Sequence, residues 1–376
     1  MGLQTGSLPD FPWDTLTPFG EVARAFPGGI VDLSVGTPVD PTPAVVQQAL
    51  ADAADSPGYP TTHGTLALRH AVVDWFGRRR GVRGLDPAAV LPTVGSKELV
   101  AFLPSLLGLG AGDVVLHPSA AYPTYDVGAR LAGATPEPTD DPASRLAESD
   151  DVRLVWLNSP GNPDGSVLGV DQLRAVVDAA RASARPVVVA SDECYAELGW
   201  DEPWASSGVP SILDPRVTGG DLAGLLAVYS LSKQSNLAGY RAAFVAGDPA
   251  LVAGLLEIRK HAGMIVPGPV QAAMTAALAD DAHVEAQRTV YGRRRRVVRA
   301  AFESAGYAVD RSHAGLYLWV RPEAGGQDSW ATVADLAGLG ILVAPGAFYG
   351  DPVHVRVALT APDERIAEAA ARLSGA

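Results

Sequence analysis

The residues best suited to chemistry lie in a short stretch in which Lys233 follows small residues and precedes an arginine. The stretch reads Ser230-Leu231-Ser232-Lys233, and Arg241 comes eight residues after the lysine. A lysine can form a Schiff base with an aldehyde when its amine is unprotonated, so its pKa must fall well below about 10.4. Partial burial and a cationic neighbour would lower it. The planar guanidinium of Arg241 can bind a phosphate through two hydrogen bonds. The stretch therefore predicts a Schiff-base lysine beside a phosphate-binding arginine.

Two upstream segments carry further polar residues. Asp192-Glu193-Cys194-Tyr195 follows the apolar run Val187-Val188-Val189-Ala190, and Asn158-Ser159-Pro160-Gly161-Asn162-Pro163 comes before that run. Seen alone, the first is compatible with a capping aspartate and the second with a generic turn. In this order and with the lysine stretch, they resemble the class I/II aminotransferases that depend on pyridoxal 5′-phosphate, over nearly the whole chain. The earlier segment departs from that family's Asn-Pro-x-Asn-Pro-Thr-Gly at Ser159 and Asp164, neither of which is the residue expected to contact the cofactor.

The resemblance implies how the cofactor ring is held. Lys233 would carry the cofactor as a Schiff base and would move the substrate Cα proton as general base and acid. Asp192 would keep the pyridine nitrogen protonated, which makes the ring an electron sink. Tyr195 and Asn162 would contact the ring hydroxyl, and Tyr122 would stack on the ring face. Core packing is the alternative for Tyr122.

The resemblance also implies two loops around the cofactor phosphate. Ser230 and Arg241 would bind it from one side. The segment Gly95-Ser96-Lys97 follows a strand-like run and opens a helix, where free backbone N–H groups and the helix dipole favour phosphate. Gly95 allows the backbone to approach closely, and Ser96 can add a hydroxyl. We therefore count Gly95, Ser96 and Lys97 among the cofactor-binding residues.

Arg356 and Gly36 are the predicted contacts of the substrate α-carboxylate. Arg356 lies in His354-Val355-Arg356-Val357-Ala358, in the middle of an apolar strand, where an unpaired charge is costly. A structural ion pair is the alternative for it. Gly36 would lie on the other side of the carboxylate. The segment Gly58-Tyr59-Pro60 resembles one that reaches into the neighbouring subunit, where Tyr59 would donate to the phosphate, so the resemblance implies a homodimer with shared active sites.

Three further segments narrow the resemblance to the succinyldiaminopimelate aminotransferases of lysine and diaminopimelate biosynthesis. The segments are 32–41, 259–267 and 341–350. Such enzymes exchange an amino group between N-succinyl-LL-2,6-diaminopimelate and 2-oxoglutarate. Because this substrate carries several carboxylates, we expect a second cation beyond Arg356, with Arg259 and Lys260 as candidates. A place on the helix surface is the alternative for both.

Other functions are compatible with parts of the pattern. An aspartate or broad-specificity aminotransferase is the second choice within the class. A lyase or decarboxylase that uses the same cofactor would share the cofactor-binding residues, but would release an eliminated group or CO₂ without forming the pyridoxamine cofactor. A cofactor-sensing module of a transcription regulator would need a fused DNA-binding domain, for which we expect the first 30 residues to be too few.

Composition limits the classes of function. The net charge is −13, from 29 basic and 42 acidic residues, which argues against non-specific binding to nucleic acid or to an anionic membrane. The single cysteine, Cys194, fits a reducing compartment. We find no His-x-x-x-His or Cys-x-x-Cys pairing and no apolar stretch near the roughly 18 residues of a membrane span. We therefore expect a cytoplasmic protein without a metal site.

The elements that must position these residues are typical of an α/β protein. At 376 residues the chain exceeds the usual domain size of roughly 100–200. Short apolar runs near turn or helix signals are typical of buried parallel strands. The resemblance implies fold-type I, with a large domain whose mostly parallel seven-stranded sheet is flanked by helices and a smaller α+β domain. The predicted divisions are 1–42 (N-terminal arm and part of the small domain), 43–255 (large cofactor-binding domain) and 256–376 (connecting helix and small C-terminal domain).

Overall fold

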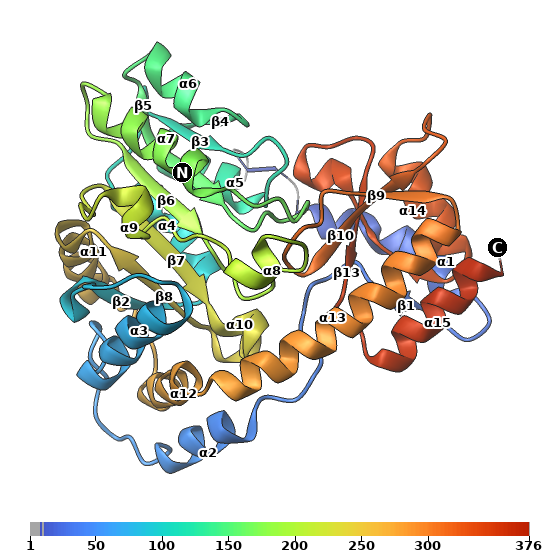
Figure 1. Cartoon of the computed structure of the whole chain (residues 1–376), viewed down its shortest axis with the longest axis horizontal. Helices are drawn as coiled ribbons and strands as arrows, with labels where there is room; N and C mark the ends of the chain where they lie inside the picture. The colour runs from blue at the N-terminus through green and yellow to red at the C-terminus, as the bar shows by residue number, and fades with distance from the viewer. Residues whose placement is uncertain (1–7, 10, 376) are drawn as a thin grey trace, which may run out of the picture.

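A seven-stranded sheet forms the centre of the larger part of the molecule (Figure 1). The computed structural model describes residues 8–9 and 11–375, so residues 1–7 and 10 of the predicted N-terminal arm lie outside the described residues. The strands are β2 (Val90–Val94), β3 (Val114–His117), β4 (Thr135–Pro138), β5 (Val152–Asn158), β6 (Val188–Asp192), β7 (Leu225–Ser230) and β8 (Ala242–Gly247). Their order is β2-β8-β7-β6-β5-β3-β4. Strand β8 is antiparallel to both neighbours, and the other pairs are parallel.

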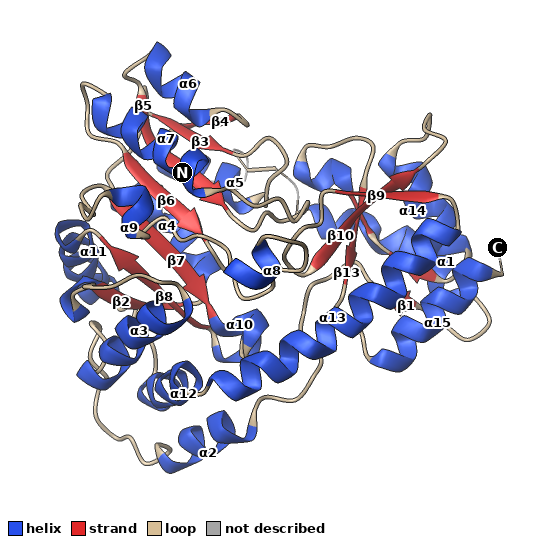
Figure 2. Cartoon of the chain, in the orientation of Figure 1, coloured by secondary structure: helices blue, strands red, loops and turns tan. Residues whose placement is uncertain are grey.

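Helices cover both faces of this sheet, as Figure 2 shows, because its central strands are apolar on both sides. They are α2 (Ala44–Asp52), α3 (Leu66–Arg79), α4 (Ser96–Leu106), α5 (Thr124–Ala132), α6 (Pro142–Glu148), α7 (Val170–Ala182), α8 (Trp204–Ser207), α9 (Pro215–Thr218), α10 (Leu231–Gln234), α11 (Pro249–Ala262) and α12 (Gly268–Ala279), with short 3₁₀ turns η3 (Pro87–Ala89) and η4 (Ala238–Tyr240). On one face α3, α7 and α12 pack through residues such as Trp75 and Met274. On the other face α4, α5 and α11 pack through residues such as Tyr125 and Leu255.

A second, smaller body contains a four-stranded antiparallel sheet and its own core. Its strands are β9 (Tyr307–Asp310), β10 (Tyr317–Pro322), β12 (Ala344–Pro345) and β13 (Val355–Ala358), in the order β12-β13-β10-β9, and β1 (Val31–Asp32) pairs in parallel with β11 (Ile341–Leu342). Its helices are α1 (Thr17–Ala25), α13 (Asp281–Ser304), α14 (Ser329–Gly338) and α15 (Asp363–Ser374), with 3₁₀ turns η2 (Pro12–Leu16) and η5 (Gly346–Tyr349). The predicted fold class, a large α/β domain with a smaller domain, is confirmed.

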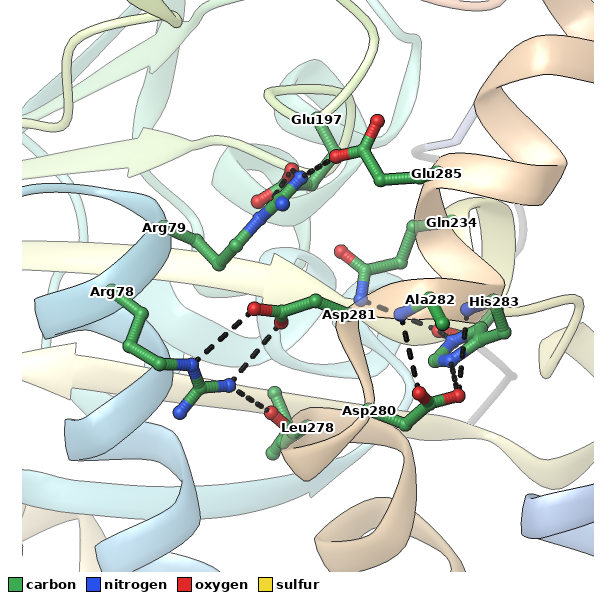
Figure 3. Close-up of polar contacts among 11 residues, drawn as sticks. Arg78, Arg79, Glu197, Gln234, Leu278, Asp280, Asp281, Ala282, His283 and Glu285 are labelled. Carbon is green, nitrogen blue, oxygen red and sulfur yellow. Dashed lines mark hydrogen bonds and ion pairs between the residues drawn. The ribbon is translucent and has the colours of Figure 1, made fainter.

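The long helix α13 runs from the larger body to the smaller one and is held at its start (Figure 1). Figure 3 shows Arg78 of α3 against Asp281, with their charged atoms 3.3 Å apart. His283 of α13 lies 2.8 Å from the hydroxyl of Ser235, two residues beyond Lys233. The start of α13 therefore supports the loop that follows the predicted site lysine. None of the helices in the described part of the chain combines the length and apolar character that crossing a membrane requires.

The register of the parallel strands brings the ends of three chain segments together. Asn158, the last residue of β5, pairs with Asp192, the last residue of β6. Asp192 in turn pairs with Val228 of β7, two residues before Ser230. Ligands of α/β sheets bind at the carboxyl ends of the strands. Segments that are far apart in the sequence thus converge on one edge of the sheet.

Candidate active site

A pocket of about 450 Å³ lies where the carboxyl ends of β5, β6 and β7 face the smaller sheet. Most of the predicted site residues line it, and these are Gly36, Ser96, Lys97, Tyr122, Asn162, Asp192, Tyr195, Ser230, Lys233, Arg241 and Arg356. Phe11 and Trp13 of the N-terminal segment line it too. In residues 8–9 and 11–375, no cluster of three or more His, Cys, Asp or Glu side chains is arranged to hold a metal ion.

Lys233 projects into the pocket from α10, which begins directly after β7 ends. Its amine donates a hydrogen bond to the Gly36 carbonyl. Burial lowers the pKa of Lys233, and the positive charges of Arg356 and Arg241 lower it further, although Tyr317 and Cys194 act in the opposite direction. A lysine with a lowered pKa supplies the neutral amine that attack on an aldehyde requires.

The corner formed by Gly95, Ser96, Ser230 and Arg241 can hold a phosphate. Gly95 has φ +75° and precedes α4, whose first turn has no side-chain cap, so its backbone N–H groups are available to an anion. A Cβ atom at Gly95 would collide with the Arg241 guanidinium, so only glycine lets that guanidinium sit against the helix start. The Ser230 hydroxyl donates to Ser232 at 2.8 Å. Two hydroxyls, a guanidinium and a helix N-terminus thus surround one space.

Asp192 lies at the opposite side of the same space and is buried at the end of β6. Its carboxylate accepts hydrogen bonds from the Tyr125 hydroxyl at 2.9 Å and from the Cys194 backbone N–H at 3.2 Å. Burial raises the pKa of Asp192, and these two donors act in the opposite direction. A carboxylate in this position can pair with a protonated ring nitrogen, which would offset the cost of burying its charge.

Tyr195 and Asn162 approach the pocket from the loops that follow β6 and β5. The backbone N–H of Asn162 donates to the Asn158 side chain at 2.8 Å, which fixes the loop against the strand end. The Asn162 side-chain oxygen accepts from Arg356 at 2.9 Å. Asn162 therefore joins the cofactor end of the pocket to the smaller sheet, and its free amide hydrogens can donate to a phenolic oxygen.

Arg356 is 2% exposed in the middle of β13. Besides Asn162, its guanidinium donates to the Ser34 carbonyl at 2.7 Å, and the Tyr317 and Tyr349 rings lie 4.0 and 4.9 Å from the guanidinium carbon. Within the part of the chain that the structure describes, no carboxylate pairs with Arg356, so it is not held in the structural ion pair that was the alternative. Its buried charge is available to a substrate carboxylate.

Three predicted site residues do not line the pocket of this chain, and they are Gly95, which packs behind the pocket residue Arg241, Tyr59 and Lys260. Tyr59 is fully exposed. Lys260 lies on the solvent side of α11 and pairs with Glu257 at 2.6 Å, so the structure does not bring it to the substrate. Its neighbour Arg259 is completely buried, with both guanidinium nitrogens on Glu98 at 2.8 and 2.9 Å, which makes it an ion pair between α11 and α4.

Tyr317, Trp13 and Tyr125 line the pocket although sequence reasoning did not single them out. Tyr317 lies on β10, two residues from Trp319, which is directly opposite Arg356 on β13. In antiparallel strands such diagonal neighbours share a face. The segment around Tyr317 has the apolar pattern of a strand, but its pairing with β13 has no local sequence signal. Trp13 and Tyr125 likewise reach the site only through long-range packing.

The comparisons with known proteins agree with this geometry. The sequence model of the family "Aminotransferase class I and II" matches residues 29–373. The chain is 56% identical to the 4-dedimethylamino-4-oxo-anhydrotetracycline transaminase OxyQ of Streptomyces rimosus (98% of this chain, 99% of the relative) and 57% identical to the "Probable aminotransferase Rv1178" of Mycobacterium tuberculosis (98% and 86%). It is 34% identical to an LL-diaminopimelate aminotransferase of Aquifex aeolicus (92% and 90%).

A solved structure shows the same arrangement of the chain. The structure described as a probable N-succinyldiaminopimelate aminotransferase from Thermus thermophilus superposes with a TM-score of 0.85 at 27% identity, over 97% of this chain and 100% of the other. The family pattern spans both sheets and the site residues between them. The chain therefore belongs to the class I and II aminotransferases, enzymes that depend on pyridoxal 5′-phosphate.

Proposed function

We propose that this aminotransferase exchanges an amino group between N-succinyl-LL-2,6-diaminopimelate and 2-oxoglutarate, in lysine and diaminopimelate biosynthesis. The observation that carries the proposal is that two cations besides Lys233 and Arg241 line the pocket. Arg356 is buried, and the exposed Lys97 lies 5.7 Å from the centres of the Phe11 and Tyr122 rings. Both proposed substrates carry more than one carboxylate, so each can use both cations.

The assignment of Lys97 to a distal carboxylate replaces two expected roles, that of Lys260 at this carboxylate and that of the Lys97 side chain at the cofactor. Of the cations that line the pocket, Lys233 is placed for the amino transfer and Arg241 for the phosphate. Arg356 is placed for the α-carboxylate, which leaves Lys97 for a distal carboxylate. The LL-diaminopimelate enzyme from Aquifex and the succinyl-diaminopimelate enzyme from Thermus support a substrate of this kind.

The side chains around the pocket fit pyridoxal 5′-phosphate. When bound, this cofactor supplies an aldehyde for the amino group and a ring that withdraws electrons from the substrate Cα. We propose that Gly95, Ser96, Ser230 and Arg241 hold the phosphate and that Asp192 holds the proton on the ring nitrogen. The space that Gly95 leaves beside Arg241 and the buried carboxylate of Asp192 are the observations that support this fit.

The remaining residues orient the ring and move the proton. We propose that Tyr195 and Asn162 donate to the ring hydroxyl oxygen and that Tyr122 covers the ring face. Lys233 would take the Cα proton of the substrate and deliver it to the cofactor carbon that had carried the aldehyde, because its amine has a lowered pKa and lies inside the pocket. Gly36, whose carbonyl accepts from Lys233, lies beside the substrate carboxylate that Arg356 binds.

We further propose that the site is completed in a homodimer. Tyr59 is fully exposed, and other large apolar residues such as Val39, Leu66 and Ile258 are exposed as well. A tyrosine that is fully exposed on its own chain is available to donate to a phosphate held by a second copy. The oligomeric state in solution, measured by light scattering on the wild type and on Tyr59→Phe, tests this assignment together with the cofactor affinity of each.

The similarity to OxyQ makes amination of a keto-tetracycline the second candidate. This relative is matched over nearly its full length, and the aromatic residues Phe11, Trp13 and Tyr122 line the pocket. A fused-ring substrate would stack on such rings, but it would not require both cations. An aspartate or broad-specificity aminotransferase is the third candidate.

The half-reaction distinguishes these functions. The protein with its cofactor is mixed in parallel with N-succinyl-LL-diaminopimelate, glutamate and aspartate, and the absorbance of the bound cofactor is followed as it changes to the amine form. We expect rapid conversion by the first two and far slower conversion by aspartate. If aspartate converts the cofactor and the succinyl compound does not, the enzyme class stands and the pathway assignment is wrong. The protein in its amine form, mixed with a 4-oxo-tetracycline, tests the second candidate.

Two lysine variants test which cation binds the distal carboxylate. Lys97→Gln is expected to raise the KM for the succinyl substrate about fivefold, the upper range for an exposed ion pair. Lys260→Gln is the matched control, because Lys260 does not line the pocket and pairs with Glu257 on the surface, and it is expected to leave the KM unchanged. Equal effects of the two substitutions would contradict the assignment.

A further inference from the structure

Tyr317 is a pocket residue to which the proposed function gives no role. It lies on β10, is 4% exposed and lines the pocket. The face of its ring lies 4.0 Å from the guanidinium carbon of Arg356. Its hydroxyl oxygen lies 3.2 Å from that of Tyr195. One side chain therefore contacts a residue placed for the substrate carboxylate and another placed for the cofactor ring.

The Tyr317 hydroxyl and the Lys233 amine both contact Gly36. A Cβ atom at Gly36 would collide with the Tyr317 hydroxyl, so this hydroxyl packs directly on the glycine backbone. The Gly36 carbonyl accepts the hydrogen bond of the Lys233 amine. Tyr317 is thus in contact with Tyr195, with Arg356 and with the glycine backbone that accepts from Lys233.

The charges around Tyr317 give its phenol an unusual acidity. Burial raises the pKa of Tyr317, but the positive charges of Arg356 and Lys233 and the hydrogen bond with Tyr195 outweigh burial, so the pKa lies below its ordinary value. Burial raises the pKa of Tyr195, and Tyr317 raises it further. The titratable groups that face Tyr317 are Cys194, Tyr195, Lys233, Tyr291, Tyr349 and Arg356.

Which of Tyr195 and Tyr317 donates the hydrogen bond between their hydroxyls depends on whether the cofactor is bound. Tyr195 has one hydroxyl hydrogen. When it donates this hydrogen to the ring oxygen of the cofactor, the 3.2 Å contact can be made only by the Tyr317 hydroxyl donating to the Tyr195 oxygen. The protonation state of Tyr317 therefore decides how firmly Tyr195 donates to the cofactor.

We infer that Tyr317 is a positioning residue that couples carboxylate binding at Arg356 to the hydrogen bond that Tyr195 makes with the cofactor. The inference rests on the proposed function only in taking Arg356, Tyr195 and Lys233 as site residues, and it is independent of which amino acid is the substrate. A carboxylate that neutralises Arg356 weakens the positive field at Tyr317. The pKa of Tyr317 then rises toward its ordinary value, which favours the protonated phenol that can donate to the Tyr195 oxygen, so that arrival of the substrate strengthens the contact at the ring.

The first test follows the absorbance of the bound cofactor as a function of pH, with and without succinate as an unreactive carboxylate. In the wild type we expect succinate to shift the titration. In Tyr317→Phe, which keeps the ring on Arg356, we expect a shift smaller by about half to one pH unit, the size expected for one neutral hydrogen bond. Tyr349→Phe is the matched control, because Tyr349 also packs on Arg356 but its buried hydroxyl has no hydrogen-bond partner among residues 8–9 and 11–375. It is expected to titrate like the wild type.

The second test uses the cofactor-free chain and follows tyrosine ionisation by ultraviolet difference absorbance. The wild type and Tyr349→Phe are expected to show one phenol that ionises below the usual value of about 10, which succinate moves upward. Tyr317→Phe is expected to lack that ionisation. This reading does not depend on catalysis.

The outcomes of the two tests separate a failure of the coupling from a failure of the proposed function. A succinate response in Tyr317→Phe equal to that of the wild type, or an equal loss in Tyr349→Phe, overturns the coupling. If circular dichroism shows that Tyr317→Phe does not fold, Tyr195→Phe takes its place. This variant is expected to keep the acidic phenol of the second test and to lose the succinate response of the cofactor absorbance in the first. A retained response of the cofactor absorbance overturns the coupling. A wild-type protein that does not bind pyridoxal phosphate contradicts the proposed function instead.

Discussion

The two ends of the pocket are built in different ways. At the cofactor end, Asp192, Ser230 and Lys233 follow directly from the carboxyl ends of neighbouring parallel strands. At the substrate end, Arg356, Tyr317 and Trp13 come from three segments of the smaller body that are far apart in the sequence. One end is therefore positioned by strand register within a single sheet, and the other by packing between distant parts of the chain.

The two ends of the pocket should therefore differ in rigidity and in their response to substitutions. The central strands β7 and β8 of the large sheet are buried on both faces, so the cofactor end shares the rigidity of the main core. The substrate end is joined to it by contacts between the two bodies, such as the hydrogen bond of 2.9 Å between Arg356 and Asn162. Substitutions at the cofactor end should change binding of the cofactor or the chemistry itself, whereas those at the substrate end should change substrate binding.

The largest effect is expected at Lys233. Lys233→Ala removes the amine that accepts and returns the Cα proton, so we expect the half-reaction rate to fall by at least about 10⁴-fold. Lys260→Ala is the control, because that lysine lies outside the pocket and pairs with Glu257, and its rate should stay close to that of the wild type. Stopped-flow absorbance of the bound cofactor measures both. A Lys233 variant that retains a rate near that of the wild type would show that another base serves the site.

Arg356→Lys tests the substrate end. Lysine keeps the charge but cannot contact Asn162, Ser34 and a carboxylate at once, as the guanidinium can. We expect the KM for the amino acid to rise about 10- to 100-fold, the effect of one or two hydrogen bonds to a charged group. The affinity for pyridoxal phosphate, measured by fluorescence titration, should change much less. If cofactor affinity fell as far as substrate affinity, the two ends would not be separable.

The contrast also explains what the sequence could and could not predict. The lysine stretch and Asp192 were recognisable because their order along the chain resembles that of the class I/II aminotransferases. The mostly parallel fold was predicted from the same resemblance and from short apolar runs typical of buried parallel strands. Tyr317 was missed because its position depends on the pairing of β10 with β13, which no local pattern specifies. Lys260 was chosen by its charge and segment, but the helix turns it to solvent beside Glu257.

Gly95→Ala tests whether the cofactor end has room for a side chain at this position. Gly95 has φ +75°, and a Cβ there would collide with Arg241, so we expect cofactor affinity to fall about tenfold or more from backbone strain and displacement of the guanidinium. Gly133→Ala is a matched control with a similar φ of +78° and nothing within 4 Å of the added carbon. It should lose stability and keep its cofactor affinity. Titration with pyridoxal phosphate measures the affinity, and an equal loss in both variants would assign the effect to strain alone.

The smallest expected effect lies behind the substrate end, where His354 joins two carboxylates. Its ring nitrogens lie 2.9 Å from Asp351 and 3.0 Å from Asp310. Burial raises the pKa of each carboxyl, but hydrogen bonds, including those from His354, outweigh burial and hold both pKa values below the ordinary range.

A carboxylate with a lowered pKa stabilises the fold at pH values above its unfolded pKa of about 3.9, and this stabilisation is lost as pH falls through the folded pKa. His354→Gln should therefore lower the melting temperature at pH 6 and differ less from the wild type below about pH 4. Melting followed by circular dichroism from pH 3 to pH 7 checks this, and a difference that grows as the pH falls would show that the two carboxylates are not stabilised by His354.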